Sequence, residues 1–82
     1  MEEYIRKIIE TQNHTLEELI NCFEMIKTKG EVAVIKFDGE RDKEQYTVFI
    51  SFPKNNREMI RADENTLKDA CKIVLLEYLK NI

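Results

Sequence analysis

The segment from Leu67 to Leu79 constrains the fold of this 82-residue chain more than any other. Its apolar residues recur at alternating intervals of three and one, the spacing of one helical face held over more than three turns; they are Leu67, Ala70, Cys71, Val74, Leu75, Tyr78 and Leu79. Ile73 and Leu76 widen this face until little of the middle of the helix is polar. Such a helix needs a large apolar surface, which either a small sheet or a second copy of the protein could supply.

Two further helical patterns precede the strands. Ile5 and Ile8 belong to an apolar stripe in the first ten residues, and Thr15 followed by Glu18 has the spacing of a capping box at the start of a second helix. Gly30 suits the end of that helix. The stretch from Gln12 to His14 interrupts the pattern, and whether the two helices are continuous stays open.

Three strands are expected next, at Glu31–Phe37, Tyr46–Phe52 and Arg57–Ala62, with polar turns between them. Asp63, Asn65 or Thr66 can cap the final helix. Loops this short favour an antiparallel meander. The sequence therefore predicts a single α+β domain over residues 1–82, a compact α-α-β-β-β-α fold with a three-stranded antiparallel sheet packed by helices.

Both faces of the predicted sheet are apolar. In the first strand Val32 and Val34 share one face, while Ala33 and Ile35 share the other, and in the second strand Phe49 lies opposite the face of Val48. A sheet with one solvated face normally alternates between apolar and polar residues. We therefore expect both faces to be covered, by helices on two sides or by a partner subunit, and we expect a homo-oligomer.

Composition and charge exclude several classes of protein. Hydrophobic residues make up 43% and charged residues 35% of the chain, which indicates a globular protein, and the net charge of −3 with scattered Lys and Arg disfavours nucleic acid as a partner. The opening Met1-Glu2-Glu3 and the absence of a long apolar run predict a cytoplasmic protein with no membrane contact. Cys22 and Cys71 lie on apolar helical faces and are expected to be buried free thiols.

The residue types that carry catalysis are sparse. His14 is the only histidine and Ser51 the only serine, and the two glycines cannot form a phosphate-binding loop. His14 is expected to have a role in a loop or a cap, and no His or Cys spacing indicates zinc. We therefore predict no catalytic residue, no metal site, no cofactor and no enzymatic activity.

Four basic residues are the candidates for a binding site. Lys54, Arg57 and Arg61 lie in and after the second hairpin, and Lys36 lies on a strand that could neighbour them. Together they could hold a phosphate or an acidic protein surface. The alternative interpretation is that they are edge-strand charges that prevent aggregation. The aromatic residues of the strands are expected to be mostly core, and one left exposed beside Arg61 could stack on a base.

Two families have similar patterns. The order of helix, three antiparallel strands and helix, with the segment Tyr46–Phe52, resembles double-stranded RNA-binding domains, but Asp63-Glu64-Asn65-Thr66 stands where that family has phosphate-binding lysines. The stretch from Arg61 to Leu76, a strand, an Ala-Asp turn and a helix with Ala70-Cys71-Lys72 before Leu75-Leu76, resembles small bacteriophage proteins of the phage ABA sandwich (α/β/α) type. This resemblance implies a phage or prophage protein with helices on both sheet faces, and it brings no site residues.

These observations predict a non-enzymatic binding protein. The phage resemblance implies an accessory protein that inhibits a host defence or regulatory protein by direct binding, in the cytosol of the host cell. One alternative is an oligomeric sponge that sequesters a small anionic nucleotide signal in a pocket with Lys54, Arg57 and Arg61. A structural or assembly role in a phage and double-stranded RNA binding are further alternatives.

Overall fold

The computed structural model describes residues 1–80 and confirms the predicted order of elements. The elements are α1 (Glu2–Glu10), α2 (Leu16–Lys27), β1 (Val32–Phe37), β2 (Tyr46–Ser51), β3 (Ile60–Glu64) and α3 (Leu67–Lys80). The three strands form one antiparallel sheet in the order β1-β2-β3. The α+β fold predicted from the sequence is therefore confirmed.

The first two helices are separate. At the start of α2, the Thr15 hydroxyl accepts a hydrogen bond from the Glu18 N–H at 3.1 Å, and the Thr15 N–H donates to Glu18 Oε1 at 2.7 Å, which confirms the capping box. Before it, the buried ring of His14 lies with Nδ1 2.7 Å from the Thr11 carbonyl oxygen. The polar residues of this link thus stabilise a break between the helices, and His14 serves the loop as predicted.

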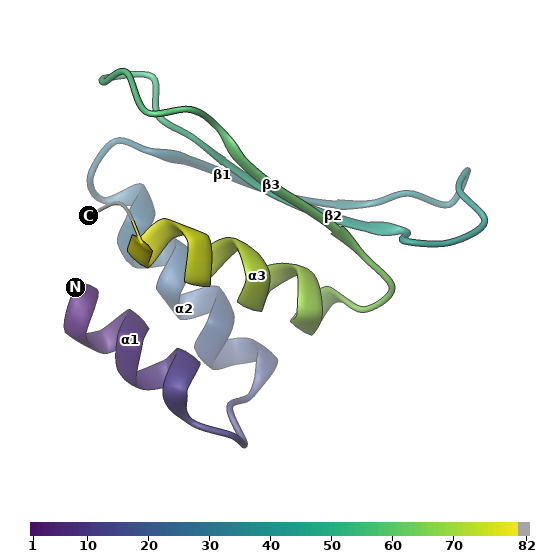
Figure 1. The fold of residues 1–82 in the computed structure, drawn as a ribbon, viewed down its shortest axis with the longest axis horizontal. Coiled ribbons are helices and arrows are strands. Elements are labelled where there is room, and N and C mark those ends of the chain that lie inside the picture. The colour runs from purple at the N-terminus through teal and green to yellow at the C-terminus, as the bar shows by residue number, and fades with distance from the viewer. Residues whose placement is uncertain (81–82) are drawn as a thin grey trace.

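All three helices lie on one side of the sheet (Figure 1). α3 packs against β2 and β3, α2 packs against β1, and α1 packs on α2 and α3. The prediction of helices on both sheet faces is wrong for the described residues, because the apolar stripe of α1 with Ile5 and Ile8 is buried against the other helices and not against the sheet. Coverage of the second face by a partner subunit stays a prediction.

The core lies between the sheet and the α2–α3 layer. On β2, Val48 is paired with Ile35 and Ala62, and Ile50 with Ala33 and Ile60, so these side chains share the face toward the helices. Val48 and Ile50 are fully buried. The other side of the core is the apolar face of α3, which buries six of the residues that the 3–1 spacing indicated, namely Ala70, Cys71, Val74, Leu75, Tyr78 and Leu79.

Cys22 of α2 and Cys71 of α3 are buried free thiols, as predicted. Burial raises the pKa of each thiol to about 11, and the charge of Glu18 adds to the effect at Cys22. Because the thiolate is the reactive form, both side chains act as small apolar core residues at neutral pH.

The third strand begins later than predicted. The sequence predicted it at Arg57–Ala62, whereas β3 spans Ile60–Glu64. Arg57 is held by the end of α3 through its guanidinium, so the chain joins the ladder with β2 only at Ile60. The strand then runs to Glu64, and the Thr66 hydroxyl, which accepts from the Asp69 N–H at 3.1 Å, caps α3.

Candidate binding surface

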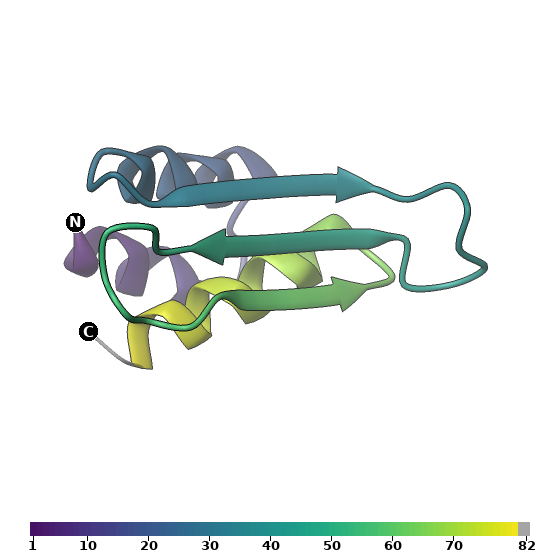
Figure 2. The same cartoon turned by 90° about the horizontal axis from the view of Figure 1, so that it is seen from above.

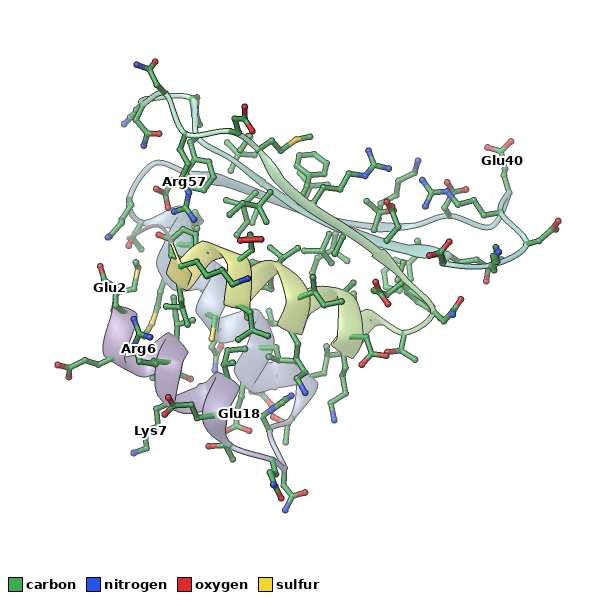
Figure 3. All side chains as sticks on the ribbon, in the orientation of Figure 1. Glu2, Arg6, Lys7, Glu18, Glu40 and Arg57 are labelled. Atoms are coloured by element: carbon green, nitrogen blue, oxygen red, sulfur yellow. The ribbon has the colours of Figure 1, made fainter. Side chains whose placement is uncertain are left out.

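One face of the sheet is left without a helix. Strand alternation places on it eight side chains, which we call the open sheet face: Val32, Val34 and Lys36 of β1, Thr47, Phe49 and Ser51 of β2, and Arg61 and Asp63 of β3. Figure 3 shows side chains standing on the sheet on the side away from the helices. The face divides along the strands into an apolar end and a polar end.

The apolar end carries Val32, Val34 and Phe49. Phe49 lies in the central strand, directly between Val34 of β1 and Arg61 of β3. Phe49 and Val34 are half-buried by their neighbours, and Val32 is 45% exposed. A phenyl ring and two branched side chains thus meet solvent side by side, which is the composition of the centre of a protein interface.

The polar end is organised around Asp63. Its carboxylate accepts hydrogen bonds from the hydroxyl of Thr47, from Arg41 Nη1 at 2.9 Å and from Arg61 Nη2 at 3.2 Å. These three donors, with Thr47 the largest contributor, hold the pKa of the Asp63 carboxyl far below its usual range. Asp63 is therefore ionised at neutral pH, and an acid this strong is a poor general base.

Arg41 brings the β1–β2 hairpin loop onto this end of the face. Besides Asp63, its Nη1 donates to the Thr47 hydroxyl at 3.2 Å and to the Glu44 carbonyl at 3.1 Å, and its Nε lies 3.2 Å from Asp38 Oδ2. Lys36 Nζ lies 3.3 Å from the same Asp38 oxygen. The backbone N–H of Glu40 is the main cause of a lowered pKa at Asp38, and the two cations add to it.

Lys36, Asp38, Arg41, Asp63 and Arg61 thus form a chain of alternating charges across the polar end. Thr47, beneath them, is almost completely buried, while the side chains of Lys36 and Arg61 stay 56% and 45% exposed. The network fixes the ionised groups in place without removing the outer two cations from solvent. A partner surface would therefore meet a preorganised charged rim beside an apolar patch.

The four predicted site residues fall into two groups. Lys36 and Arg61 lie on the open sheet face, whereas Lys54 and Arg57 lie in the segment between β2 and β3. Figure 3 shows Arg57 at the end of the sheet near the C-terminus of α3. Lys54 is exposed and passes over Gly30, so close that a Cβ there would lie 2.9 Å from its Nζ.

Arg57 stabilises the fold. Its guanidinium carbon lies 4.6 Å from the centre of the Phe52 ring and 5.0 Å from that of Tyr78, and these rings stack on each other at 6.1 Å. Its Nη2 donates to the carbonyl oxygens of Glu77 and Tyr78 at 3.1 and 2.8 Å. A cation is favourable at a helix C-terminus, where carbonyls lack partners in the helix. Arg57 therefore caps α3 and is largely committed to the protein itself.

A groove of about 510 Å³ lies between the β3 edge and α3. Its apolar residues are Met59, Ile60 and Ile73. Arg57 and Arg61 border it, but the acidic side chains of Glu58 and Glu77 border it too. The groove is therefore close to neutral and not strongly attractive for an anion.

Sequence reasoning missed Arg41, Thr47 and Asp63 as parts of one site. Arg41 lies in one of the turns between strands that the sequence predicted to be polar, and Asp63 was predicted as a possible helix cap. The alternation of the strands could have placed Thr47 and Asp63 beside Lys36, given the antiparallel register. The return of Arg41 from the loop depends on tertiary contacts that no local pattern indicates.

Comparisons with protein-family models, with curated proteins and with solved structures find no significant match to this chain. Within residues 1–80 no helix has the length and apolar character needed to cross a membrane. The same residues contain no group of three or more His, Cys, Asp or Glu side chains placed to hold a metal ion.

Proposed function

We propose that this chain is a non-enzymatic binding protein whose open sheet face docks onto a partner protein. The observation that carries the proposal is the apolar patch of Val32, Val34 and Phe49, which all three helices leave bare. A half-buried aromatic ring among branched side chains leaves apolar surface in contact with solvent, and a charged rim beside such a patch is the usual anatomy of an interface.

The polar end supports a protein partner over a small anion. Three cations there meet two carboxylates within ion-pair distance, Lys36 and Arg41 at Asp38, and Arg41 and Arg61 at Asp63. Such a mixed surface suits the mixed charges of another protein and gives specificity more than affinity. The phage resemblance makes a host defence or regulatory protein the proposed target, and this part of the proposal rests on the resemblance alone.

A nucleotide sponge is the second candidate, and the β3–α3 groove is the feature that favours it. Two of the predicted basic residues, Arg57 and Arg61, border this groove. However, Arg57 Nη2 already donates to two carbonyls, and Glu58 and Glu77 repel phosphate. A sponge would therefore need further cations, which a second subunit would have to supply.

The test compares two phenylalanines that differ in face. Phe49 lies on the open sheet face, whereas Phe37 is paired with Tyr46 on the opposite face and is 68% exposed. Affinity-tagged wild-type protein, Phe49→Ser and Phe37→Ser are produced in bacteria, and co-purifying proteins are quantified by mass spectrometry. We expect a partner retained by the wild type and by Phe37→Ser and reduced at least tenfold with Phe49→Ser.

Equal recovery with Phe49→Ser and wild type would contradict the proposal. Sedimentation velocity on the same three proteins tests whether the partner is instead a second copy of this chain. A dimer that dissociates only with Phe49→Ser would show that a second copy covers the open sheet face. Native mass spectrometry that finds a nucleotide-sized mass on the wild type would instead support the sponge.

A further inference from the structure

The two outer strands of the sheet differ in how well their edges are protected. β3 carries Arg61, Asp63 and Glu64, charges that discourage pairing with another strand. β1 reads Val-Ala-Val-Ile-Lys-Phe, has no proline, and carries Lys36 as its only charge. Because β1 pairs only with β2, the backbone groups on its other side have no strand partner among the described residues.

A groove of about 310 Å³ runs beside this unprotected edge. It lies between β1 and α2 and is mostly apolar, with Ile20 and Phe23 from the helix and Val32, Ala33 and Ile35 from the strand. Ala33 and Ile35 point toward the helical layer, yet both are only partly buried. The core is thus left unfilled along this edge.

The position of α2 explains the groove. The backbone of α3 lies close to β2 and β3, whereas the backbone of α2 lies close to β1 and farther from β2. Helices pack 8–10 Å apart while strands are about 4.8 Å apart, so a helix beside α3 must lie partly beyond β1. In Figure 2 α2 indeed extends past the β1 edge of the sheet. α2 therefore presents an apolar surface to the position of a fourth strand, which residues 1–80 do not supply.

We propose that the groove between α2 and β1 accepts an extended segment of a partner protein as a fourth strand of the sheet. The main chain of the segment pairs with the free edge of β1, and every second side chain enters the groove over Ile20 and Phe23. This is strand addition, in which backbone hydrogen bonds supply affinity and alternate pockets supply specificity. Of the residues on the open sheet face only Val32 borders this groove, and the proposal does not depend on the function proposed for that face.

Charge defines the chemistry of the segment. The ionised groups at the lip of the groove are Glu24, Lys27 and Glu31. Lys27 Nζ lies 3.0 Å from Glu24 Oε2, and Glu31 Oε1 accepts a hydrogen bond from the Tyr78 hydroxyl at 2.8 Å. Two of the three charges thus pair with each other, and the Glu31 carboxylate is held by a neutral phenol. The occupant that suits the apolar floor of the groove carries uncharged apolar side chains at alternate positions.

A second copy of this chain does not fit the same site. If β1 paired antiparallel with β1 of another copy about a two-fold axis perpendicular to the sheet, the helices of both copies would lie on the same side, and the axis would lie about 2.4 Å outside β1, half the strand spacing. The overhanging α2 helices of the two copies would then occupy the same space, well within the 8–10 Å that packed helices require. An extended segment has no helix beneath it and avoids this clash.

Selection from a display library of random linear 12-residue peptides tests the proposal, followed by fluorescence anisotropy of the enriched peptides with a fluorescein label. The blocking variant is Ile20→Lys, which places a charge in the groove. The matched control is Leu16→Lys, one turn earlier on the same helix at a residue that is 37% exposed and does not line the groove. Circular dichroism and thermal unfolding check that both variants fold.

We expect enriched peptides with apolar residues at alternate positions, weakened at least tenfold by Ile20→Lys and less than twofold by Leu16→Lys. Amide hydrogen exchange on the wild-type complex, which needs no variant, should show new protection in residues 32–36. Failure to enrich any peptide, a helical apolar spacing, or binding that only Phe49→Ser weakens would overturn the proposal. A dimer that dissociates with Ile20→Lys would overturn it too, because it would assign the groove to a second copy.

Discussion

The two faces of the sheet are built from the same three strands, but helices cover only one of them. On the face toward the helices, Val48, Ile50 and Ala62 are buried and join the sheet to α3. On the open sheet face, Val34 and Phe49 are as apolar as their neighbours one residue away but touch no helix. Apolar character therefore does not by itself identify the core of this protein. Only the side of the sheet on which the helices lie separates structural from exposed residues.

The largest expected effect is on the face toward the helices. Ile50→Ala removes a fully buried side chain from the centre of β2 and leaves a cavity between sheet and helices, so the free energy of unfolding should fall by roughly 2–5 kcal/mol. Urea denaturation followed by circular dichroism measures the change. For a domain this small the loss is a large share of the total stability. A loss below about 1 kcal/mol would contradict this, because Ile50 would then contribute no more to stability than a residue of the open sheet face.

The second expected effect concerns the end of α3. Arg57→Ala removes two hydrogen bonds to helix-terminal carbonyls and a cation that lies close to the Phe52 and Tyr78 rings, and it should lower the free energy of unfolding by roughly 2–3 kcal/mol. Lys54→Ala, which removes an exposed cation from the same loop, is the control and should change it by no more than about 0.5 kcal/mol. Equal effects of the two variants would mean that Arg57 does not cap the helix.

The polar end of the open sheet face should respond to pH. The pKa of Asp63 is lower in the folded protein than the value of about 3.9 expected in the unfolded chain, so its ionised form stabilises the fold above that pH. This contribution is lost as the pH falls below about 4, toward the folded pKa. Asp63→Asn should cost roughly 0.5–1 kcal/mol at pH 7, because the pairs are partly exposed, and should flatten the loss of stability in acid.

Urea denaturation of wild type and Asp63→Asn between pH 2.5 and 7 measures this difference. The control is Asp42→Asn, at an exposed carboxylate of the hairpin loop. This variant should lose stability in acid as the wild type does. If the free energy of unfolding changed with pH in the same way for the wild type and Asp63→Asn, a stabilising role for the Asp63 network would be contradicted.

The sequence predicted best what local interactions decide. The capping box of Thr15 and Glu18 and the apolar face of α3 depend on residues three or four positions apart, and both were found where the spacing placed them. The alternation of β2 likewise assigned Val48 and Phe49 to opposite faces. These features require no knowledge of the rest of the chain.

What could not be predicted depends on which surfaces meet. The stripe of α1 with Ile5 could have packed on the second sheet face, and only its burial against α2 and α3 leaves Phe49 without a helix above it. From the sequence, the positive charge of Arg57 indicated an anion site. Nothing in the neighbouring residues shows that its side chain instead binds the end of α3. The same residue type therefore has opposite meanings at Arg57, which is part of the fold, and at Arg61, which remains on the surface.

The smallest effect on stability should come from Phe49→Ser, and it separates the two faces most sharply. Although the ring is large, it lies on a face with no helix above it, so its removal leaves no closed cavity and solvent fills the space. We expect the free energy of unfolding to fall by less than about 1 kcal/mol, against several times that for Ile50→Ala one position away. Urea denaturation of the two variants under identical conditions gives the ratio of the two losses in stability.

If Phe49→Ser instead cost 2 kcal/mol or more, the ring would belong to the folding core of the monomer, and its partial exposure could no longer be taken as evidence for a partner. A stable Phe49→Ser protein that has lost its partner would show that the second apolar face serves binding.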